Sequence, residues 1–476
     1  MFRERPKMQT FHRPVLTASL IALLTAFGGL SPTLAQDRVP ESQAEISLSF
    51  APLVKKAAPA VVNIFAKTIV PSRQSPFAND PFFSQFFGNL GQARPQVQNS
   101  LGSGVILSDD GIVVSNYHVV GEADEISIVL NDRREFNAEV LLADAAADLA
   151  ILKLEDAHDL PYLALRDSDD VEVGELVLAI GNPFGVGQTV SSGIVSGLAR
   201  SGAAAGSERG YFIQTDAPIN PGNSGGALID VKGDLIGVNT SILSRSGGSN
   251  GIGFAIPAAL IEQFVAQARD GAAVFRHPWA GMTGHGVDTD MAGALGLDHP
   301  EGIVIDALHE DSPFAAAGFT PGDVILAVDG NPISSPAEMV FRMSVKGMGG
   351  KAQIERLRDG ERSTIAVPMT TAPEEPARDP VETTDKGPIP GMTLVTVNPA
   401  VIAEYQLPLT TTGAMVQEPG QVGQRAGLRP GDVLLAVNGD ETETSRDADK
   451  ALSRASRSLQ LDVLRGGRKV TMRFRL

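Results

Sequence analysis

The first candidate for chemistry is a serine in a glycine-rich stretch. Ser224 is the third residue of Gly-Asn-Ser-Gly-Gly at 222–226, and glycines on both sides of a serine allow main-chain N–H groups to point at one oxygen. This pattern suits acyl transfer, with Ser224 as nucleophile and Gly222, Asn223 and Ser224 as the oxyanion hole. The N–H groups of Gly222 and Ser224 are the natural donors. Taken alone, such a stretch is more often an ordinary turn.

A nucleophilic serine needs a base, and the base needs a carboxylate that orients it. His118 ends the apolar strand pattern at 113–117, whereas the other histidines beyond the N-terminal segment lie beside Pro, Gly or Asp, where solvated loops are expected: His158, His277, His285, His299 and His309. Asp148 directly precedes an apolar run, where a carboxylate is unusual without a partner. Asp144 competes with it, although its alanine-rich neighbourhood favours a turn-capping role. His118, Asp148 and Ser224 follow the chain order of chymotrypsin, which suits a site between two β-barrels.

Short apolar runs separated by Gly, Asn, Asp and Pro extend from about residue 47 to residue 270, and they predict the short strands of a β-barrel or sandwich. Pro257 opens an expected helix that Gly271 ends. The segment 71–99 interrupts the pattern and carries five phenylalanines between Phe77 and Phe87. It is too apolar for a freely solvated loop, and a cluster that covers its own barrel is the simplest alternative.

The C-terminal part of the chain is duplicated. Residues 317–330 return as 426–439, at an offset of 427 − 318 = 109 residues, which suits a repeated small domain. We call 275–371 the first repeat and 389–476 the second repeat. Residues 372–388 between them are rich in Pro, Glu, Asp and Thr, and they predict a linker.

The N-terminus predicts export. Residues 1–35 combine a basic start, an uncharged apolar run at 15–30 and small residues before Ala35, as in a signal peptide cleaved near Ala35. An uncleaved membrane anchor is the alternative, but the apolar run is short for a bilayer.

Composition excludes several classes of protein. The 476 residues allow roughly three domains. A net charge of −17 argues against nucleic acid as a partner. The absence of cysteine excludes disulfides, thiolate catalysis and cysteine-ligated zinc. The sequence contains neither a phosphate-binding loop nor a His-Glu-x-x-His motif, so we expect no metal and no cofactor.

The chain resembles the HtrA (Deg, or Do-like) family of exported serine proteases. The resemblance is carried by 101–106, 115–120, 148–153, 181–185, 215–226 and 251–257, and with the two repeats it covers essentially all of the mature chain. It implies a mainly β protein, with a trypsin-like double β-barrel at 36–271 followed by two PDZ-like α/β domains. It also implies periplasmic location, oligomers built from trimers, and a regulatory insertion at 71–99 that reaches a neighbouring subunit.

The resemblance further implies two binding sites. Ser241, Ile242 and Ile252 would form a small apolar pocket for Val, Ile or Ala before the scissile bond, and a core strand position is the alternative for each. Ala280, Gly281 and Met282 would bind the carboxylate of a peptide C-terminus in the first repeat. In the second repeat the corresponding loop is 389–392, where Pro390 has no N–H to donate, so we expect weaker binding of free C-termini there unless the register slips by one residue.

Together these features predict an ATP-independent serine endopeptidase that degrades misfolded or unfolded exported proteins with apolar residues. A peptide-binding chaperone or adaptor, in which proteolysis is minor, is the alternative.

Overall fold

The computed structural model describes residues 49–70, 96–182, 187–201, 211–220, 222–242, 251–385, 387–455 and 458–475. The expected signal peptide and the phenylalanines of the 71–99 insertion lie outside these residues. Within them, no helix has the length and apolar character that crossing a membrane requires.

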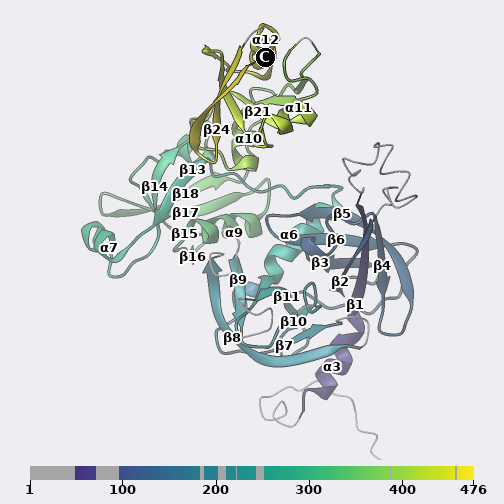
Figure 1. Cartoon of the computed structure of the whole chain (residues 1–476). Coiled ribbons are helices and arrows are strands. Elements are labelled where there is room, and N and C mark those ends of the chain that lie inside the picture. The colour runs from purple at the N-terminus through teal and green to yellow at the C-terminus, as the bar shows by residue number, and fades with distance from the viewer. Residues whose placement is uncertain are drawn as a thin grey trace, which may run out of the picture.

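Two closed β-barrels form the N-terminal half (Figure 1). The first has the strand order β1-β2-β3-β6-β5-β4 and consists of β1 (Val61–Val70), β2 (Gln96–Ile106), β3 (Ile112–Ser115), β4 (Glu125–Val129), β5 (Glu135–Asp144) and β6 (Leu149–Leu154). The second has the order β10-β11-β12-β9-β8-β7 and consists of β7 (Leu176–Gly181), β8 (Thr189–Ser201), β9 (Tyr211–Thr215), β10 (Ala227–Ile229), β11 (Leu235–Ile242) and β12 (Gly253–Pro257). The end of the predicted insertion, 96–99, belongs to β2 and pairs with β1.

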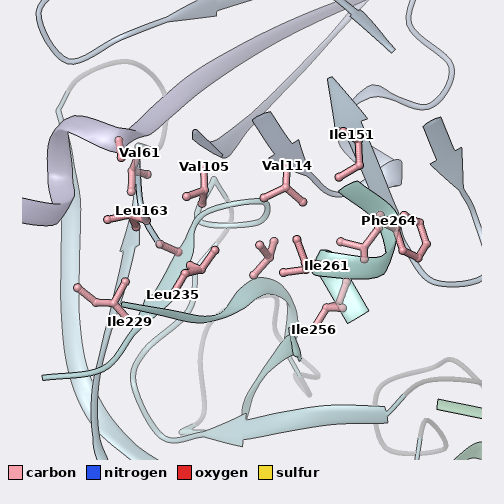
Figure 2. Packing of buried hydrophobic residues seen from close by; sticks show 14 of the residues in the cluster. Val61, Val105, Val114, Ile151, Leu163, Ile229, Leu235, Ile256, Ile261 and Phe264 are labelled. Carbon is pink, nitrogen blue, oxygen red and sulfur yellow. The ribbon is translucent and has the colours of Figure 1, made fainter. Parts of the chain in front are cut away.

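The largest apolar cluster lies where the two barrels meet. Figure 2 shows Val105 and Val114 of the first barrel facing Leu235 and Ile256 of the second. Helix α6 (Ala258–Arg269) closes the cluster with Ile261, which is fully buried, so the helix expected after Pro257 is confirmed. Burial of each such side chain contributes about 1.5–3 kcal/mol, and the cluster therefore fixes one barrel against the other.

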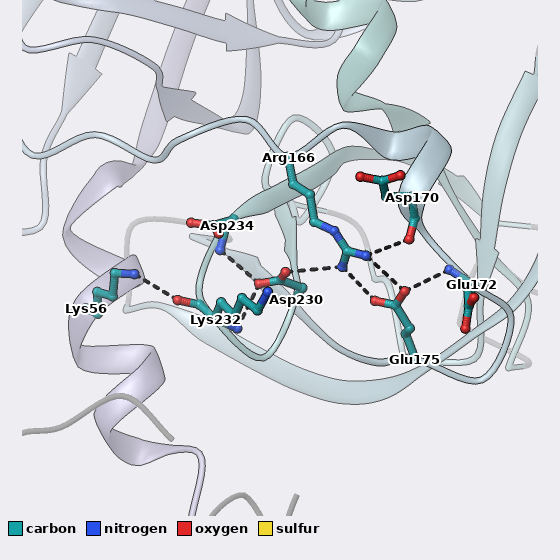
Figure 3. Close-up of polar contacts among 8 residues, drawn as sticks. All are labelled: Lys56, Arg166, Asp170, Glu172, Glu175, Asp230, Lys232 and Asp234. Carbon is teal, nitrogen blue, oxygen red and sulfur yellow. Dashed lines mark hydrogen bonds and ion pairs between the residues drawn. The ribbon is translucent and has the colours of Figure 1, made fainter. Parts of the chain in front are cut away.

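A polar network braces the loops beneath the second barrel (Figure 3). The Arg166 guanidinium lies 2.7 Å from Glu175 and 3.2 Å from Asp230, whose side chain is buried. The hydrogen bond from Arg166 outweighs burial and holds the pKa of Glu175 below its ordinary value. Helix α3 (Ala51–Ala57) joins the network through Lys56, whose Nζ donates to the Lys232 carbonyl at 2.8 Å. The network anchors the hairpin between β10 and β11. Residues of the candidate site lie at the far ends of these two strands.

Each repeat folds around its own antiparallel sheet. The first contains β13 (Met282–Gly286), β14 (Ile303–Leu308), β15 (Val324–Val328), β16 (Asn331–Pro332), β17 (Lys351–Arg358), β18 (Glu361–Pro368), α7 (Thr289–Leu295), α8 (Pro313–Ala316) and α9 (Pro336–Lys346). The second contains β19 (Val381–Glu382), β20 (Thr393–Thr396), β21 (Ala414–Glu418), β22 (Val433–Val437), β23 (Asp440–Glu441), β24 (Ser458–Arg465), β25 (Arg468–Arg475), α10 (Pro399–Tyr405), α11 (Gly420–Arg425) and α12 (Ser445–Ser453). The expected fold class, a mainly β double barrel followed by two α/β units, is confirmed.

The duplicated motif forms the same buried clamp in both repeats. Asp323 accepts hydrogen bonds from Arg358 and from the Thr320 N–H, and Asp432 is held in the same way by Arg465 at 2.6 and 2.7 Å. Burial would raise the pKa of Asp323, but the hydrogen bonds from Arg358 and the main chain hold it below its ordinary value.

One boundary differs from the sequence expectation. Strand β19 lies inside the predicted linker 372–388 and pairs with β20, so the sheet of the second repeat begins before residue 389. Composition alone suggests a flexible connection here, but main-chain hydrogen bonds to the neighbouring strand hold this segment in place.

Candidate active site

His118 and Asp148 meet at the edge of the first barrel. His118 lies in the short helix α5 (Tyr117–Val120), and its Nδ1 is 2.9 Å from both carboxylate oxygens of Asp148. The main-chain N–H of His118 also donates to Asp148 Oδ1 at 3.0 Å. Asp148 has a φ of 53°, a left-handed conformation that aspartate tolerates better than most residues. The buried Asn116 side chain donates to the Asp148 carbonyl at 2.9 Å and holds this conformation.

Thr240 of β11 connects this pair to the serine. Its hydroxyl donates to Asp148 Oδ2 at 2.6 Å, and its carbonyl accepts a hydrogen bond from the Ser224 hydroxyl at 3.0 Å. The sequence drew attention to the stretch around Thr240 only as a pocket wall. Thr240 lies two residues before the end of β11, and nothing in the local sequence indicated its contact with Asp148, which belongs to the other barrel.

The glycine-rich stretch is held from the first barrel by Ser103 of β2. The Ser103 N–H donates to the Ser224 carbonyl at 2.9 Å, its hydroxyl donates to the Gly222 carbonyl at 2.6 Å, and the hydroxyl oxygen accepts from the Asn182 N–H at 2.8 Å. Ser103 is fully buried. These contacts fix the peptide groups on either side of the Ser224 N–H.

Glycine is required at two positions of this turn. Gly222 and Gly225 have φ values of 97° and 81°, which other residues rarely adopt. A Cβ at Gly225 would lie 2.0 Å from the Ser103 carbonyl oxygen. The close approach of the two chains therefore depends on the absence of a side chain.

Asp144 caps a turn, as the sequence suggested, and it also has a partner that the sequence did not reveal. One carboxylate oxygen accepts from the Ala147 N–H at 2.7 Å, and the other lies 2.9 Å from His277 Nε2. The expectation of a solvated loop was wrong for His277, which packs edge-on against Phe275, and for His309, whose side chain is only 14% exposed and packs edge-on against Trp279. Burial alone would raise the pKa of Asp144, but the hydrogen bond and charge of His277 leave it below its ordinary value.

The expected pocket residues are described only in part. Ser241 and Ile242 belong to β11, but their side chains lie outside the described residues. Ile252 is partly buried against the cluster between the barrels.

The candidate carboxylate loop lines a large cavity. Gly281 has a φ of 59°, and Met282 opens β13. A cavity of about 860 Å³ is lined by Trp279, Ala280, Gly281 and Met282, by Val340 and Phe341 of α9, and by residues of both neighbouring units. This cavity borders both β13 and α9, the two walls of the expected peptide groove in the first repeat.

Helix α9 also contacts the second barrel. The Phe341 ring stacks on Tyr211 of β9 at 3.9 Å, and Arg342 forms an ion pair with Asp169. Burial at this contact raises the pKa of Tyr211. One wall of the groove in the first repeat is thus attached to the barrel that carries Ser224.

Comparison with known proteins agrees with this architecture. Residues 102–238 match the trypsin-like peptidase domain family, and residues 284–369 and 414–465 each match a PDZ domain family. The chain is 36% identical to the "Probable periplasmic serine endoprotease DegP-like" of Pseudomonas fulva, over 90% of this chain and 93% of the relative. It is 34% identical to the protein of the same name from Halomonas elongata, over 90% and 93%.

Solved structures give the same result. The HtrA-type protease AlgW with a decapeptide is 40% identical with a TM-score of 0.52, and the match covers 68% of this chain and 99% of that one. The same protease with a tripeptide is 38% identical with a TM-score of 0.52, covering 68% and 98%. The chain is a serine endoprotease with a trypsin-like domain and two PDZ domains, and it belongs to the HtrA family of DegP-like periplasmic serine endoproteases.

Proposed function

We propose that Ser224, His118 and Asp148 form the catalytic triad of this endoprotease. The observation that carries the proposal is the continuous set of hydrogen bonds from His118 through Asp148 and Thr240 to Ser224, which spans the two barrels. In the resting structure the Ser224 hydroxyl donates to the Thr240 carbonyl. The hydroxyl must turn toward His118 before attack. Hydrogen bonds between a nucleophile and its base often form fully only when substrate is bound.

The reaction then follows from the chemistry of these groups. Ser224 Oγ attacks the peptide carbonyl while His118 takes its proton, and His118 returns that proton to the leaving amine. Asp148 keeps the Nδ1–H of the imidazole oriented. The N–H groups of Gly222 and Ser224 stabilise the oxyanion, and Asn223 fixes the turn between them through its N–H to the Asn220 carbonyl at 3.0 Å.

The substrates that we propose are misfolded or unfolded exported proteins, cleaved without ATP in the periplasm after removal of the signal peptide near Ala35. Ser241, Ile242 and Ile252 would accept a small apolar side chain before the scissile bond. The names of the relatives support the periplasmic location, and quality control is the role inferred from the family.

We also propose that the first repeat captures C-termini through Ala280, Gly281 and Met282. The cavity beside β13 and the unpaired outer edge of this strand support this role, and the peptides bound in the relatives' structures are consistent with it. Assembly into oligomers built from trimers, with the 71–99 insertion reaching a neighbour, completes the proposal.

Casein cleavage by the purified full chain tests the catalytic assignment. Ser224→Ala should remove nearly all turnover, and Asp148→Asn should lower kcat by roughly 10⁴-fold because the imidazole is then held in the wrong tautomer to accept the proton of Ser224. Asp144→Asn is the matched control, with an expected loss of less than about tenfold, because Asp144 contacts His277 and not His118. If wild type and Ser224→Ala both leave casein intact but equally prevent a client from aggregating, the chaperone alternative is correct.

A further inference from the structure

The two repeats present equivalent grooves. Gly281 and Gly391 have φ values of 59° and 72°; Gly281 directly precedes β13, and Gly391 lies two residues before the equivalent strand β20. Each strand then has a register shift at the same place, between Thr283 and Gly284 and between Thr393 and Leu394. Helix α12 corresponds to α9, since each follows the short strand, β16 or β23, that comes directly after the duplicated motif.

A PDZ domain binds an extended chain by adding it as a strand beside this helix. In the first repeat β13 is the last strand of its sheet, and among the described residues no strand pairs with its outer edge. In the second repeat the outer edge of β20 is already paired. Strand β19 runs antiparallel to it, with Val381 opposite Leu394 and Glu382 opposite Thr393.

The residue that follows β19 occupies the loop that would bind a carboxylate. The Gly391 N–H donates to the Thr383 carbonyl at 2.9 Å, and the Met392 N–H donates to the Thr383 hydroxyl oxygen at 2.9 Å. The Thr383 N–H donates in turn to the Met392 carbonyl at 2.8 Å. Thr383 is only 4% exposed. Both N–H groups that this loop can offer after Pro390 are therefore used within the chain.

The polarity of the loop favours threonine over a terminal carboxylate. The Ile389 carbonyl accepts a hydrogen bond from the Thr383 hydroxyl at 2.6 Å. A carboxylate has no proton to donate, so its oxygen and the Ile389 carbonyl oxygen, both acceptors, would face each other. Pro390 has no N–H that could offset their repulsion.

The same segment is also held at its other end. The Thr396 N–H donates to the Arg378 carbonyl at 2.6 Å, and the Ser445 hydroxyl at the start of α12 donates to the Asp379 carbonyl at 2.6 Å. Arg446 of α12 adds an ion pair with the Asp379 carboxylate. Residues 378–383 thus lie between β20 and the start of α12, where a peptide ligand of a PDZ domain lies.

We propose that the groove of the second PDZ domain is a binding site for the chain's own segment 378–383. The first repeat is then the only one of the two described grooves open to free C-termini, and a peptide enters the second only by displacing this internal strand. The inference rests on the PDZ fold of the repeats and not on the catalytic assignment, so its test uses no turnover.

Amide hydrogen exchange in the full chain carrying Ser224→Ala tests the proposal. Thr383→Val keeps the β-branched shape but removes the hydroxyl, so the amide of Met392 should exchange at least about tenfold faster, with smaller increases at Gly391 and Thr396. Thr384→Val is the matched control, because Thr384 is exposed and no hydroxyl contact is described for it. Equal exchange rates at these amides in the Ser224→Ala chain with and without Thr383→Val overturn the proposal.

A second measurement does not depend on how far that variant opens the groove. An apolar peptide with a free C-terminus, added to the Ser224→Ala chain, should slow exchange at 280–283 and leave the amides of Gly391 and Met392 unchanged. Thr383→Pro removes both the hydroxyl and the N–H of the internal strand, and it should allow the peptide to change exchange at Gly391 and Met392. Equal responses of both repeats in the Ser224→Ala chain with Thr383 intact overturn the proposal.

Discussion

Ser103→Ala provides the sharpest test of how the first barrel supports catalysis in the second. The substitution removes a hydroxyl that donates to the Gly222 carbonyl and accepts from the Asn182 N–H, while the Ser103 N–H still holds the Ser224 carbonyl. Two buried hydrogen bonds at about 1 kcal/mol each predict a stability loss of about 2 kcal/mol.

The expected effect on catalysis is larger than a general loss of stability would explain. Removal of an oxyanion donor lowers kcat by about 10²–10³. Because Ser103 only positions the proposed oxyanion donors, and one of its two contacts to the turn remains, kcat should fall by roughly 10- to 100-fold with KM changed less than about twofold. Affinity for a peptide boronate, whose tetrahedral adduct places an oxygen in the same site, should fall by the same factor as kcat/KM.

Ser168→Ala is the matched control for Ser103→Ala. Ser168 is a buried serine whose hydroxyl accepts from the Ala259 N–H at 3.2 Å, at the start of α6 and away from Ser224. Ser168→Ala should lower stability but leave kcat unchanged. The reasoning fails if Ser103→Ala keeps kcat within about twofold of wild type, or if kcat falls without a matching loss of boronate affinity.

Further substitutions test the turn, the joint between barrel and repeat, and the duplicated clamp. Gly225→Ala should abolish turnover because its Cβ meets a carbonyl oxygen at 2.0 Å, whereas Gly174→Ala, at a similar positive φ with open space around it, should only lower thermal stability. His277→Gln should lower the free energy of unfolding by about 1–2 kcal/mol. Urea unfolding monitored by the fluorescence of the single tryptophan measures this loss. Burial would raise the pKa of Asp144, but His277 holds it below its ordinary value of 3.8. The ionised carboxylate therefore contributes its full stabilisation of the folded state above pH 3.8, and this contribution is lost as the pH falls through the lower pKa of the folded state. The stability difference between wild type and Asp144→Asn should not shrink between pH 7 and 5. Arg465→Met leaves a carboxylate that is 2% exposed without its guanidinium, and it should destabilise the second repeat by about 3 kcal/mol in calorimetry.

Local patterns predicted much of this architecture. The alternation of short apolar runs with turn residues indicated the barrels, because strands such as β3, β6 and β7 are buried at nearly every position and are bounded by turns. The helix after Pro257 and the duplicated motif were visible for the same reason: their signals lie within a few consecutive residues. His118, Asp148 and Ser224 could be selected because each lies within a few residues of the end of a strand, although His118 belongs to helix α5 and not, as expected, to the strand itself.

Contacts between distant parts of the chain were not predictable in this way. Ser103 and Thr240 lie in ordinary strand sequence, and their roles depend on the register between barrels far apart along the chain. His277 was misinterpreted because flanking residues report local solvation and not the carboxylate that the fold brings to the ring. The linker composition concealed β19 because a strand of two residues, held by its neighbour, needs little apolar character of its own.

The segment that precedes the internal strand forms a short connection between the two PDZ domains. The Thr370 carbonyl accepts from the Trp279 N–H at 2.8 Å, so the first repeat holds the chain up to that point. The Pro373 carbonyl already accepts from the Ala400 N–H of α10 at 3.1 Å. Only residues 371–372 lie between these two attachments, and the three residue steps from Thr370 to Pro373 span at most about 11 Å. The segment that composition marks as a linker is therefore mostly attached to the second repeat.

Loss of the internal strand should consequently change the spacing of the repeats. The chain contains no cysteine, so Glu361→Cys and Glu443→Cys place one spin label on each repeat at exposed positions. In the Ser224→Ala background, Thr383→Pro releases the strand next to the tether and should broaden the distance distribution between the labels, whereas Thr384→Val should leave it as in the parent chain. A distribution that stays equally narrow in Thr383→Pro, in a chain whose Met392 amide has lost its protection, would show that the contacts of Pro373 with α10 fix the spacing without help from the groove.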